Sequence, residues 1–166
     1  MILSIVIPAY NEEGSIEKTI KEIYNVLVIQ KIPHEIIVVN DKSTDKTLEL
    51  LEVLSKEIKT LKYYSSPGPS GFGYAVRYGL EKFSGQCVAI MMADLSDSPN
   101  DLVLFYKKMV EENLDCVFGS RFIKGGKTVD YPALKKIINR IANIIIRILI
   151  GISYNDTTNA FKLYKR

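Results

Sequence analysis

LSIVIPAYNEE, residues 3–13, is a short apolar run that passes into a polar loop. The apolar part predicts a β-strand, and the polar residues after it are typical of a turn. A helical pattern follows over Ser15–Ile29, and a second β-rich run covers Glu35–Asn40. A strand, a helix and another strand in this order indicate two parallel strands joined by a crossover helix.

The same alternation continues along the chain. We expect further strands at Leu61–Ser65, Val88–Met92 and Asp115–Ser120, and further helices at Thr44–Ile58, Tyr74–Phe83 and Pro99–Asn113. The predicted fold class is therefore α/β, with a Rossmann-like, mostly parallel sheet sandwiched by helices. Because no repeat, low-complexity stretch or linker interrupts residues 1–166, we expect a single domain.

The composition limits the class of protein. Of the 166 residues, 47% are apolar, which is enough for one sizeable core, and the net charge of +3 is far from that of a dedicated nucleic-acid binder. Cys87 and Cys116 lie in apolar runs, which favours buried core residues over a disulfide or a metal site. The first strand has no basic leader before it, so we expect a cytoplasmic chain.

Polar side chains follow the first two predicted strands. In an open parallel sheet, ligands bind beyond the carboxyl ends of the strands. Pro8, Tyr10 and Glu12 after the first strand, and Asp41 after the second, are therefore candidate substrate-binding residues. The Asp41 carboxylate can accept the paired donors of a base edge or a ribose. The alternative is that both loops are only turns and helix caps, which favour the same residue types.

A glycine-rich loop, SPGPSGFG, follows the third predicted strand at residues 66–73. A glycine such as Gly71 allows a ligand to approach the backbone closely. The loop does not end in a lysine followed by serine or threonine, and it follows the third strand instead of the first. It therefore fits neither a nucleoside triphosphatase nor a Rossmann dehydrogenase.

The fourth predicted strand ends in a loop that contains two carboxylates, Asp94 and Asp97, together with Ala93 and Ser96. Oxygen ligands select hard cations, so this loop predicts a Mg²⁺ or Mn²⁺ site in which the diphosphate of a ligand completes the coordination shell. The alternative is a capped helix that carries surface acids.

Together these segments resemble family 2 glycosyltransferases of the GT-A fold, particularly the dolichyl- or polyprenyl-phosphate sugar synthases. The resemblance covers essentially the whole chain, and it rests on SIVIPAYNEE (4–13), VNDKSTDKT (39–47), ADLS (93–96), GSRF (119–122) and DTTNAFK (156–162). It implies that the first segment holds the base and ribose of a GDP- or UDP-linked sugar and that Asp41 contacts the base. It also implies a metal at Asp94, an acceptor-side arginine at Arg121, and inversion by single displacement.

Two features depart from the family pattern. The metal motif is usually Asp-x-Asp, but its first position here is Met92, which binds hard cations weakly. Asp94 keeps the second position, and Asp97 is close enough in sequence to supply the missing charge. The chain also stops at Arg166, where such synthases continue, so we expect a catalytic domain that is truncated at its C-terminus.

The kind of acceptor is predicted from a missing motif and from two arginine side chains. Members with hydroxyl acceptors need a general base, usually in a Glu-Asp motif, and no such pair follows the metal loop. Its absence favours a phosphate acceptor, which is mostly dianionic at neutral pH because its second pKa is about 6, although truncation explains the absence equally well. Arg121 and Arg140 are the candidate phosphate-binding residues. The alternative for Arg140 is a solvated helix face.

Residues Pro132–Ile150 show an amphipathic helical pattern. One stripe carries Ile137, Ile138, Ile141, Ile144, Ile145 and Ile148. Arginines interrupt the apolar run, so the pattern predicts a helix that lies in a membrane interface rather than one that spans it. This places the chain peripherally at the cytoplasmic face of a membrane. The alternative is a core helix packed on the sheet.

Two other functions fit the same residues. Met92 and the early C-terminus favour a catalytically weak nucleotide-sugar-binding module, and a family 2 transferase with a hydroxyl acceptor is a further alternative. A bare receiver-like or flavodoxin-like domain does not explain why the family-like segments occur in the same order along the chain.

Overall fold

The computed structural model describes residues 1–123 and 132–166, and the chain divides into two compact units. The first unit contains Met1–Val117 and Phe161–Arg166, and the second contains Phe118–Ala160. The last six residues therefore belong to the same unit as the first 117.

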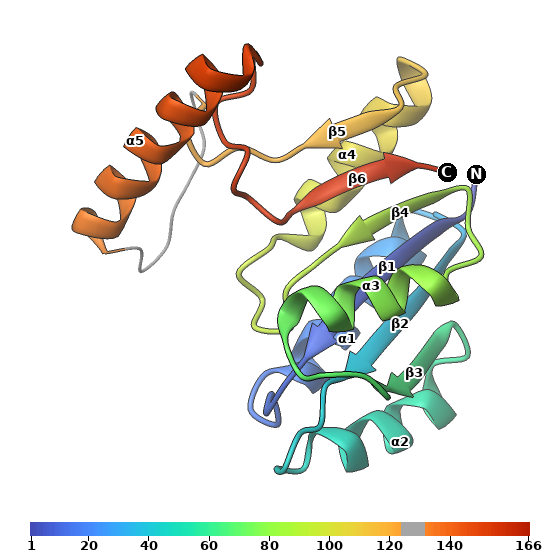
Figure 1. Cartoon of the computed structure of the whole chain (residues 1–166). Coiled ribbons are helices and arrows are strands. Elements are labelled where there is room, and N and C mark those ends of the chain that lie inside the picture. The colour runs from blue at the N-terminus through green and yellow to red at the C-terminus, as the bar shows by residue number, and fades with distance from the viewer. Residues whose placement is uncertain (124–131) are drawn as a thin grey trace. The chain divides into compact units, whose positions relative to one another are not determined.

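The elements alternate along the chain as the sequence predicts (Figure 1). The strands are β1 (Leu3–Ala9), β2 (His34–Asn40), β3 (Leu61–Ser65), β4 (Cys87–Ile90), β5 (Cys116–Phe118) and β6 (Lys162–Lys165). The helices are α1 (Ile16–Ile29), α2 (Thr47–Glu57), α3 (Phe72–Lys82), α4 (Pro99–Glu111) and α5 (Ala133–Ile150). At the start of α4, Ser98 accepts a hydrogen bond from the Asp101 N–H and Pro99 occupies the first turn, so this helix begins where the sequence predicts.

The six strands form one mostly parallel sheet in the order β3-β2-β1-β4-β6-β5. β1 pairs in parallel with β2 and β4, and β2 pairs in parallel with β3. The exception is β6, which runs antiparallel to β4 with Lys165 opposite Cys87. The sequence analysis did not predict β6, because four residues with a lysine at each end show too little alternation to identify a strand.

The sheet has an apolar core on each face. Leu3, Ile5 and Ile7 of β1 are fully buried among residues of α1, α2 and α4. Val6 points to the other face, where it packs with Ala75 of α3. Helices therefore cover both faces, as Figure 1 shows and as the α/β sandwich predicts.

Helix α3 lies very close to the sheet. A Cβ added at Gly79 would lie 2.4 Å from Val6 Cγ1 and 3.1 Å from Val39 Cγ2. These distances are too short for a side chain, so the glycine is what allows the helix backbone to rest on β1 and β2.

A buried carboxylate joins the amino ends of the strands. Glu35 is 6% exposed and accepts hydrogen bonds from the Ser4 hydroxyl, from the backbone and hydroxyl of Ser84, and from Lys62 Nζ at 3.0 Å. Burial acts to raise the pKa of Glu35, but the hydrogen bonds outweigh it and lower this pKa to about 2. The carboxylate is therefore ionised over the physiological pH range.

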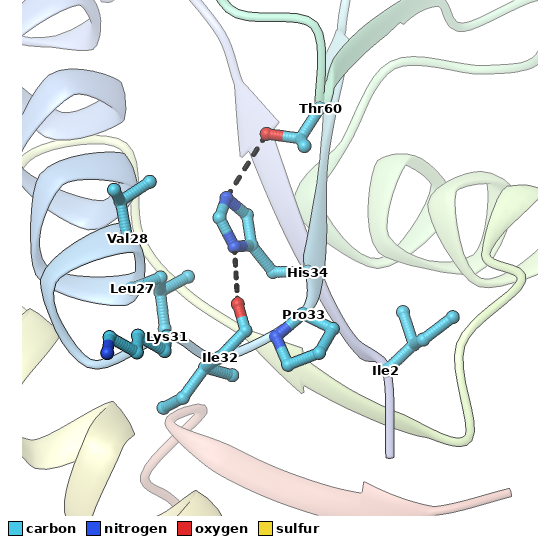
Figure 2. A pocket seen from close by; sticks show the side chains of 8 residues that line it. All are labelled: Ile2, Leu27, Val28, Lys31, Ile32, Pro33, His34 and Thr60. Carbon is cyan, nitrogen blue, oxygen red and sulfur yellow. Dashed lines mark hydrogen bonds between the residues drawn. The ribbon is translucent and has the colours of Figure 1, made fainter.

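A shallow pocket of about 450 Å³ lies beside the amino end of β2 (Figure 2). Its wall contains the single histidine, His34. The Nδ1 atom of His34 lies 2.8 Å from the Ile32 carbonyl oxygen, and its Nε2 atom lies 3.1 Å from the Thr60 hydroxyl. Both ring nitrogens thus bind neighbouring segments of the protein, and none of the sequence-predicted site residues lines this pocket.

The second unit contains α5, whose two sides differ. Asn143 is 1% exposed; it accepts hydrogen bonds from the backbone of Thr157 and Thr158 and donates to the Asn139 carbonyl. The six isoleucines of the predicted stripe are 48–75% exposed. Among the described residues, no helix is both long enough and apolar enough to cross a membrane.

Candidate functional site

The loops that follow β1 and β2 are fastened to each other at the carboxyl edge of the sheet. Hydrogen bonds of 2.8–3.0 Å join Asn11 to Ser43 and Thr44, Glu12 to Thr47, and Glu13 to Asp45. Most polar residues of the second loop therefore hold the two loops together, which agrees with the simpler interpretation of this cluster as turn and cap residues.

Asp41 differs from its neighbours in this loop. It lies at the end of β2 and is 4% exposed. Its Oδ2 atom accepts hydrogen bonds from the Gly71 N–H at 2.6 Å and from the Ser70 hydroxyl at 2.9 Å. Its Oδ1 atom is buried and has no partner among the described residues. Since a buried polar atom without a partner costs about 1–3 kcal/mol, Oδ1 is a candidate acceptor for a ligand donor.

Gly71 positions this carboxylate from the glycine-rich loop. It has a φ of 143°, which residues with a side chain rarely adopt, and it directly precedes α3. Gly71 is a candidate from the sequence because a glycine allows close backbone approach, and in the structure its N–H group donates to Asp41.

The three candidates from the end of β1 and the loop after it lie in different environments. Pro8 is buried within the strand, opposite Val39 of β2. Tyr10 is 57% exposed and follows Ala9, whose carbonyl oxygen accepts the Asp41 N–H at 2.8 Å. An exposed aromatic ring next to an unpaired acceptor is suited to stack on a base. Glu12 accepts a hydrogen bond from the Ser15 hydroxyl at 2.6 Å, at the start of α1.

The loop after β4 presents Asp94 to solvent. The Ala93 carbonyl oxygen accepts the Thr19 hydroxyl at 2.6 Å, which fastens the loop to α1. Asp94 is exposed, and its Oδ1 atom accepts the Ser96 N–H at 3.0 Å. Leu95 between them has a φ of 60°, a conformation that costs energy for a residue with a Cβ and that often occurs at functional sites.

Asp97 has a structural contact that the sequence did not predict. Its Oδ2 atom accepts the backbone N–H of Met92 at 2.9 Å. The carboxylate expected to compensate for Met92 as a metal ligand therefore uses one oxygen to hold Met92 in place.

The oxygen ligands in the loop after β4 fit a divalent cation that binds together with a diphosphate. The part of the chain that the structure describes contains no group of three or more His, Cys, Asp or Glu residues that could hold a metal. Asp94 commits only Oδ1 to a hydrogen bond among these residues. Mg²⁺ commonly takes one or two carboxylates and completes its shell with water and substrate phosphates, so Asp94 can serve as the protein ligand.

Arg121, in the second unit, forms a two-point ion pair with Asp156. Arg121 Nε lies 2.8 Å from Oδ2 and Nη2 lies 2.7 Å from Oδ1, while Nη2 also donates to the Thr158 hydroxyl. Burial acts to raise the pKa of Asp156, but the hydrogen bonds and charge of Arg121 lower it below its ordinary value. Asp156 thus fixes the plane of the guanidinium group.

Asp156, in the family-like segment 156–162, and Asn143 carried no predicted role. Both are buried polar residues that hold the turn around Thr157 and Thr158. The one sequence signal for Asn143 is an asparagine inside an isoleucine-rich helix. Arg140 is exposed on the same helix, and none of the ion pairs among the described residues includes it. Both arginines belong to the second unit, whereas the donor-side candidates belong to the first.

The sheet, its covering helices and the acidic loops at its carboxyl edge define an α/β domain of the GT-A type. Glucosyl-3-phosphoglycerate synthase of Mycobacterium tuberculosis, solved with Mn²⁺, uridine-diphosphate and phosphoglyceric acid, has this fold. Its TM-score with this chain is 0.73 at 22% identity, over 99% of this chain and 55% of that one. The family model for glycosyl transferase family 2 matches residues 4–166, and the chain belongs to this family.

Two curated relatives have related names. A dolichol-phosphate mannosyltransferase of Pyrococcus furiosus is 33% identical over 89% of this chain and 41% of its own length. A dodecaprenyl-phosphate galacturonate synthase of Rhizobium johnstonii is 29% identical over 98% of this chain and 47% of its own length. The chain thus spans less than half the length of these two relatives.

Proposed function

We propose that this chain is a catalytic domain that transfers a sugar, with inversion, from a nucleoside-diphosphate sugar to a polyprenyl or dolichyl phosphate. Membership of glycosyl transferase family 2 and the names of the two curated relatives support this reaction class. The single observation that carries the proposal is the unpaired Asp41 Oδ1 atom at the end of β2. The neighbouring strand β1, which ends just before Tyr10, lies between β2 and β4, the strand that leads to the Asp94 loop.

The donor side consists of residues from the first unit. Asp41 accepts an N–H group of the base, and Tyr10 stacks on the base. Pro8, Glu12, Gly71, Ala93 and Ser96 shape the loops around the nucleotide. Asp94 would hold Mg²⁺ or Mn²⁺, which when bound would supply Lewis-acid neutralisation of the diphosphate charge.

The acceptor needs no protein base. An oxygen of the phosphate dianion attacks the anomeric carbon, the bond from that carbon to the diphosphate oxygen breaks, and the bonding electrons leave with the nucleoside diphosphate. Arg121, held by Asp156, contacts the acceptor phosphate, and Arg140 supplies a second positive charge.

A membrane surface is the proposed location of the acceptor. The exposed isoleucines of α5 share the helix with Arg140 and Arg147, a combination suited to the interface of an anionic membrane. We therefore propose that the chain acts peripherally at the cytoplasmic face.

Transfer assays test this function. The chain is incubated with Mn²⁺, GDP- or UDP-linked sugars and polyprenyl phosphate, and glycolipid formation is the expected result. Parallel reactions contain a polyprenyl alcohol or phosphoglyceric acid, because the M. tuberculosis synthase carries that acid in its crystal structure. Transfer only to these acceptors would contradict the lipid-phosphate assignment.

Met92 favours a second candidate function, a binding module that retains nucleotide sugars but transfers them poorly. A hard cation gains little from a thioether in place of a carboxylate. Nucleotide-sugar binding without product in any of these reactions would support this candidate over the transferase.

A further inference from the structure

The hydrogen bonds of Asp41 limit which base the donor site accepts. Its Oδ2 atom already accepts the Gly71 N–H at 2.6 Å and the Ser70 hydroxyl at 2.9 Å. A carboxylate oxygen has two lone pairs, so these two donors occupy Oδ2. Only Oδ1 remains, and Oδ1 is the buried atom that has no partner among the described residues.

The fold keeps Oδ2 occupied. Gly71 directly precedes α3, and α3 rests so closely on Val6 and Val39 that Gly79 has no room for a side chain. The helix start therefore has little freedom to move away from Asp41. A backbone N–H group can only donate, so the oxygen that faces Gly71 remains an acceptor. The sequence predicts that Asp41 accepts paired donors, whereas in the structure only its Oδ1 atom is without a partner among the described residues.

Uracil and guanine present different groups to such an atom. The uracil edge has one donor, N3–H, between two carbonyl groups. Guanine has two adjacent donors, N1–H and N2–H₂, which together match both oxygens of a carboxylate. With Oδ2 occupied, guanine would leave one of its donors buried and unpaired, and an unpaired donor strongly disfavours binding.

We propose, on the basis of the glycosyltransferase function above, that Asp41 selects uridine over guanosine nucleotides, so that the sugar donor is UDP-linked. Oδ1 has almost no contact with solvent in this structure, so the groups that cover it must move before a base reaches it. Once the base is bound, water does not compete for the N3–H hydrogen bond.

Calorimetric titration of the chain with UDP and with GDP, each in the presence of Mn²⁺, tests the selectivity. We expect UDP to bind at least about tenfold more tightly, since one hydrogen bond to a charged group is at stake. UDP methylated at N3 should lose a similar factor. GDP binding as tight as UDP binding, or full affinity of the methylated UDP, would overturn the proposal. If no nucleoside diphosphate binds, the proposed function itself fails.

The variant Asp41→Asn makes a sharper test. The Gly71 N–H forces the amide oxygen to the Oδ2 position, so the NH₂ group takes the Oδ1 position and becomes a donor. This donor opposes uracil N3–H but matches the acceptor N3 of cytosine. We expect the variant to bind CDP more tightly than UDP, which reverses the order in the unchanged chain.

Asp115→Asn is the matched control, because Asp115 is an exposed aspartate directly before β5 and its variant should keep the preference for UDP. If Asp41→Asn folds and still prefers UDP to CDP, Asp41 does not select the base and the proposal is wrong. If that variant does not fold, the N3-methylated UDP decides the question on the unchanged chain.

Discussion

Asp94 and Asp97 lie three residues apart, and their hydrogen bonds give them different roles. Asp94 is exposed and uses one oxygen within its own loop, whereas Asp97 accepts the backbone N–H of Met92. Asp94→Asn should lower the Mn²⁺-dependent affinity for a nucleoside diphosphate at least about tenfold, because an amide is a poorer ligand for a hard cation. The thermal stabilisation by the nucleotide should fall accordingly. Thermal shifts with and without Mn²⁺ measure the effect.

Asp97→Asn is the informative companion variant. It keeps an oxygen that can accept the Met92 N–H but loses the negative charge. If Asp97 only holds the loop, this variant should keep Mn²⁺-dependent binding, whereas Asp97→Ala should lower the melting temperature. Loss of metal affinity in Asp97→Asn, with an unchanged melting temperature, would instead make Asp97 a metal ligand.

Arg121 offers a test of the acceptor side. Arg121→Ala should keep donor affinity and lose transfer by roughly one to two orders of magnitude, the equivalent of about 1.5–3 kcal/mol for one charge-assisted contact. Arg121→Lys should recover only part of the rate, because an ammonium group loses the planar fork. Because the Arg121 pair with Asp156 is also structural, melting temperatures are measured alongside. Wild-type transfer by Arg121→Ala would refute the acceptor role.

Glu35 makes stability depend on pH in acid. Its pKa falls from an ordinary 4.5 to about 2 in the folded chain, so the ionised form is the stabilising one. This contribution is complete above about pH 4.5 and disappears as the pH falls toward 2. We expect Glu35→Gln to lower the free energy of unfolding by roughly 2 kcal/mol at pH 7. Urea denaturation at several pH values should show that this difference shrinks between pH 4.5 and 2.

At the scale of single residues, the sequence predicts which loops carry polar groups but not what each group binds. The role of Asp41 Oδ1 depends on Ser70 and Gly71, which are about 30 positions away in the sequence. Asp156 likewise binds a residue 35 positions away, Arg121. Side-chain partners at such separations have no periodicity that a sequence pattern could reveal.

Elements are predicted more fully, because periodicity is a property of each segment by itself. Within the described residues, five of the six strands and each of the helices occur where the pattern places them, with ends that differ by up to three residues. The one missed strand, β6, is short and antiparallel. Its place depends on β4, which lies more than 70 positions earlier in the sequence.

The packing of α3 on the sheet gives an element-scale prediction. Gly79→Ala should destabilise the chain by about 1–3 kcal/mol, because the new methyl group overlaps Val6 and forces the helix off the sheet. Gly73→Ala, on the same helix, is the control, since a Cβ there has nothing within 4 Å. It should be neutral or slightly stabilising, as alanine favours helices. Equal unfolding free energies for the two variants in urea would contradict this account.

Helix α5 gives a second element-scale prediction. If its exposed isoleucines lie in a membrane interface, the chain should sediment with vesicles that contain anionic lipid. The double variant Ile141→Asn with Ile148→Asn should reduce the bound fraction several-fold. Each methylene group that the membrane interface buries contributes about 0.8 kcal/mol to the binding free energy, and the variant removes this contribution at two positions. The control is Val53→Asn, an exposed apolar residue on α2. Equal binding by all three proteins would argue against an interfacial α5.

At the scale of the whole molecule, the sequence correctly predicts a mostly parallel α/β sheet between helices and the family to which the chain belongs. It does not predict how the chain divides. The boundary falls inside β5, between Val117 and Phe118, and Phe161–Arg166 belongs again to the first unit. Local sequence patterns do not indicate that the last residues of the chain belong to the first unit.

The position of β6 between β4 and β5 has a consequence for how the molecule can change. The second unit leaves the sheet after β5 and returns through β6, and these two strands are neighbours. It is therefore an insertion whose two ends are held next to each other by the sheet. Protein chains tolerate the replacement of a segment inserted in this way. We therefore expect that Phe118–Ala160 can be exchanged for another segment while the loops that follow β1, β2 and β4 stay unaltered.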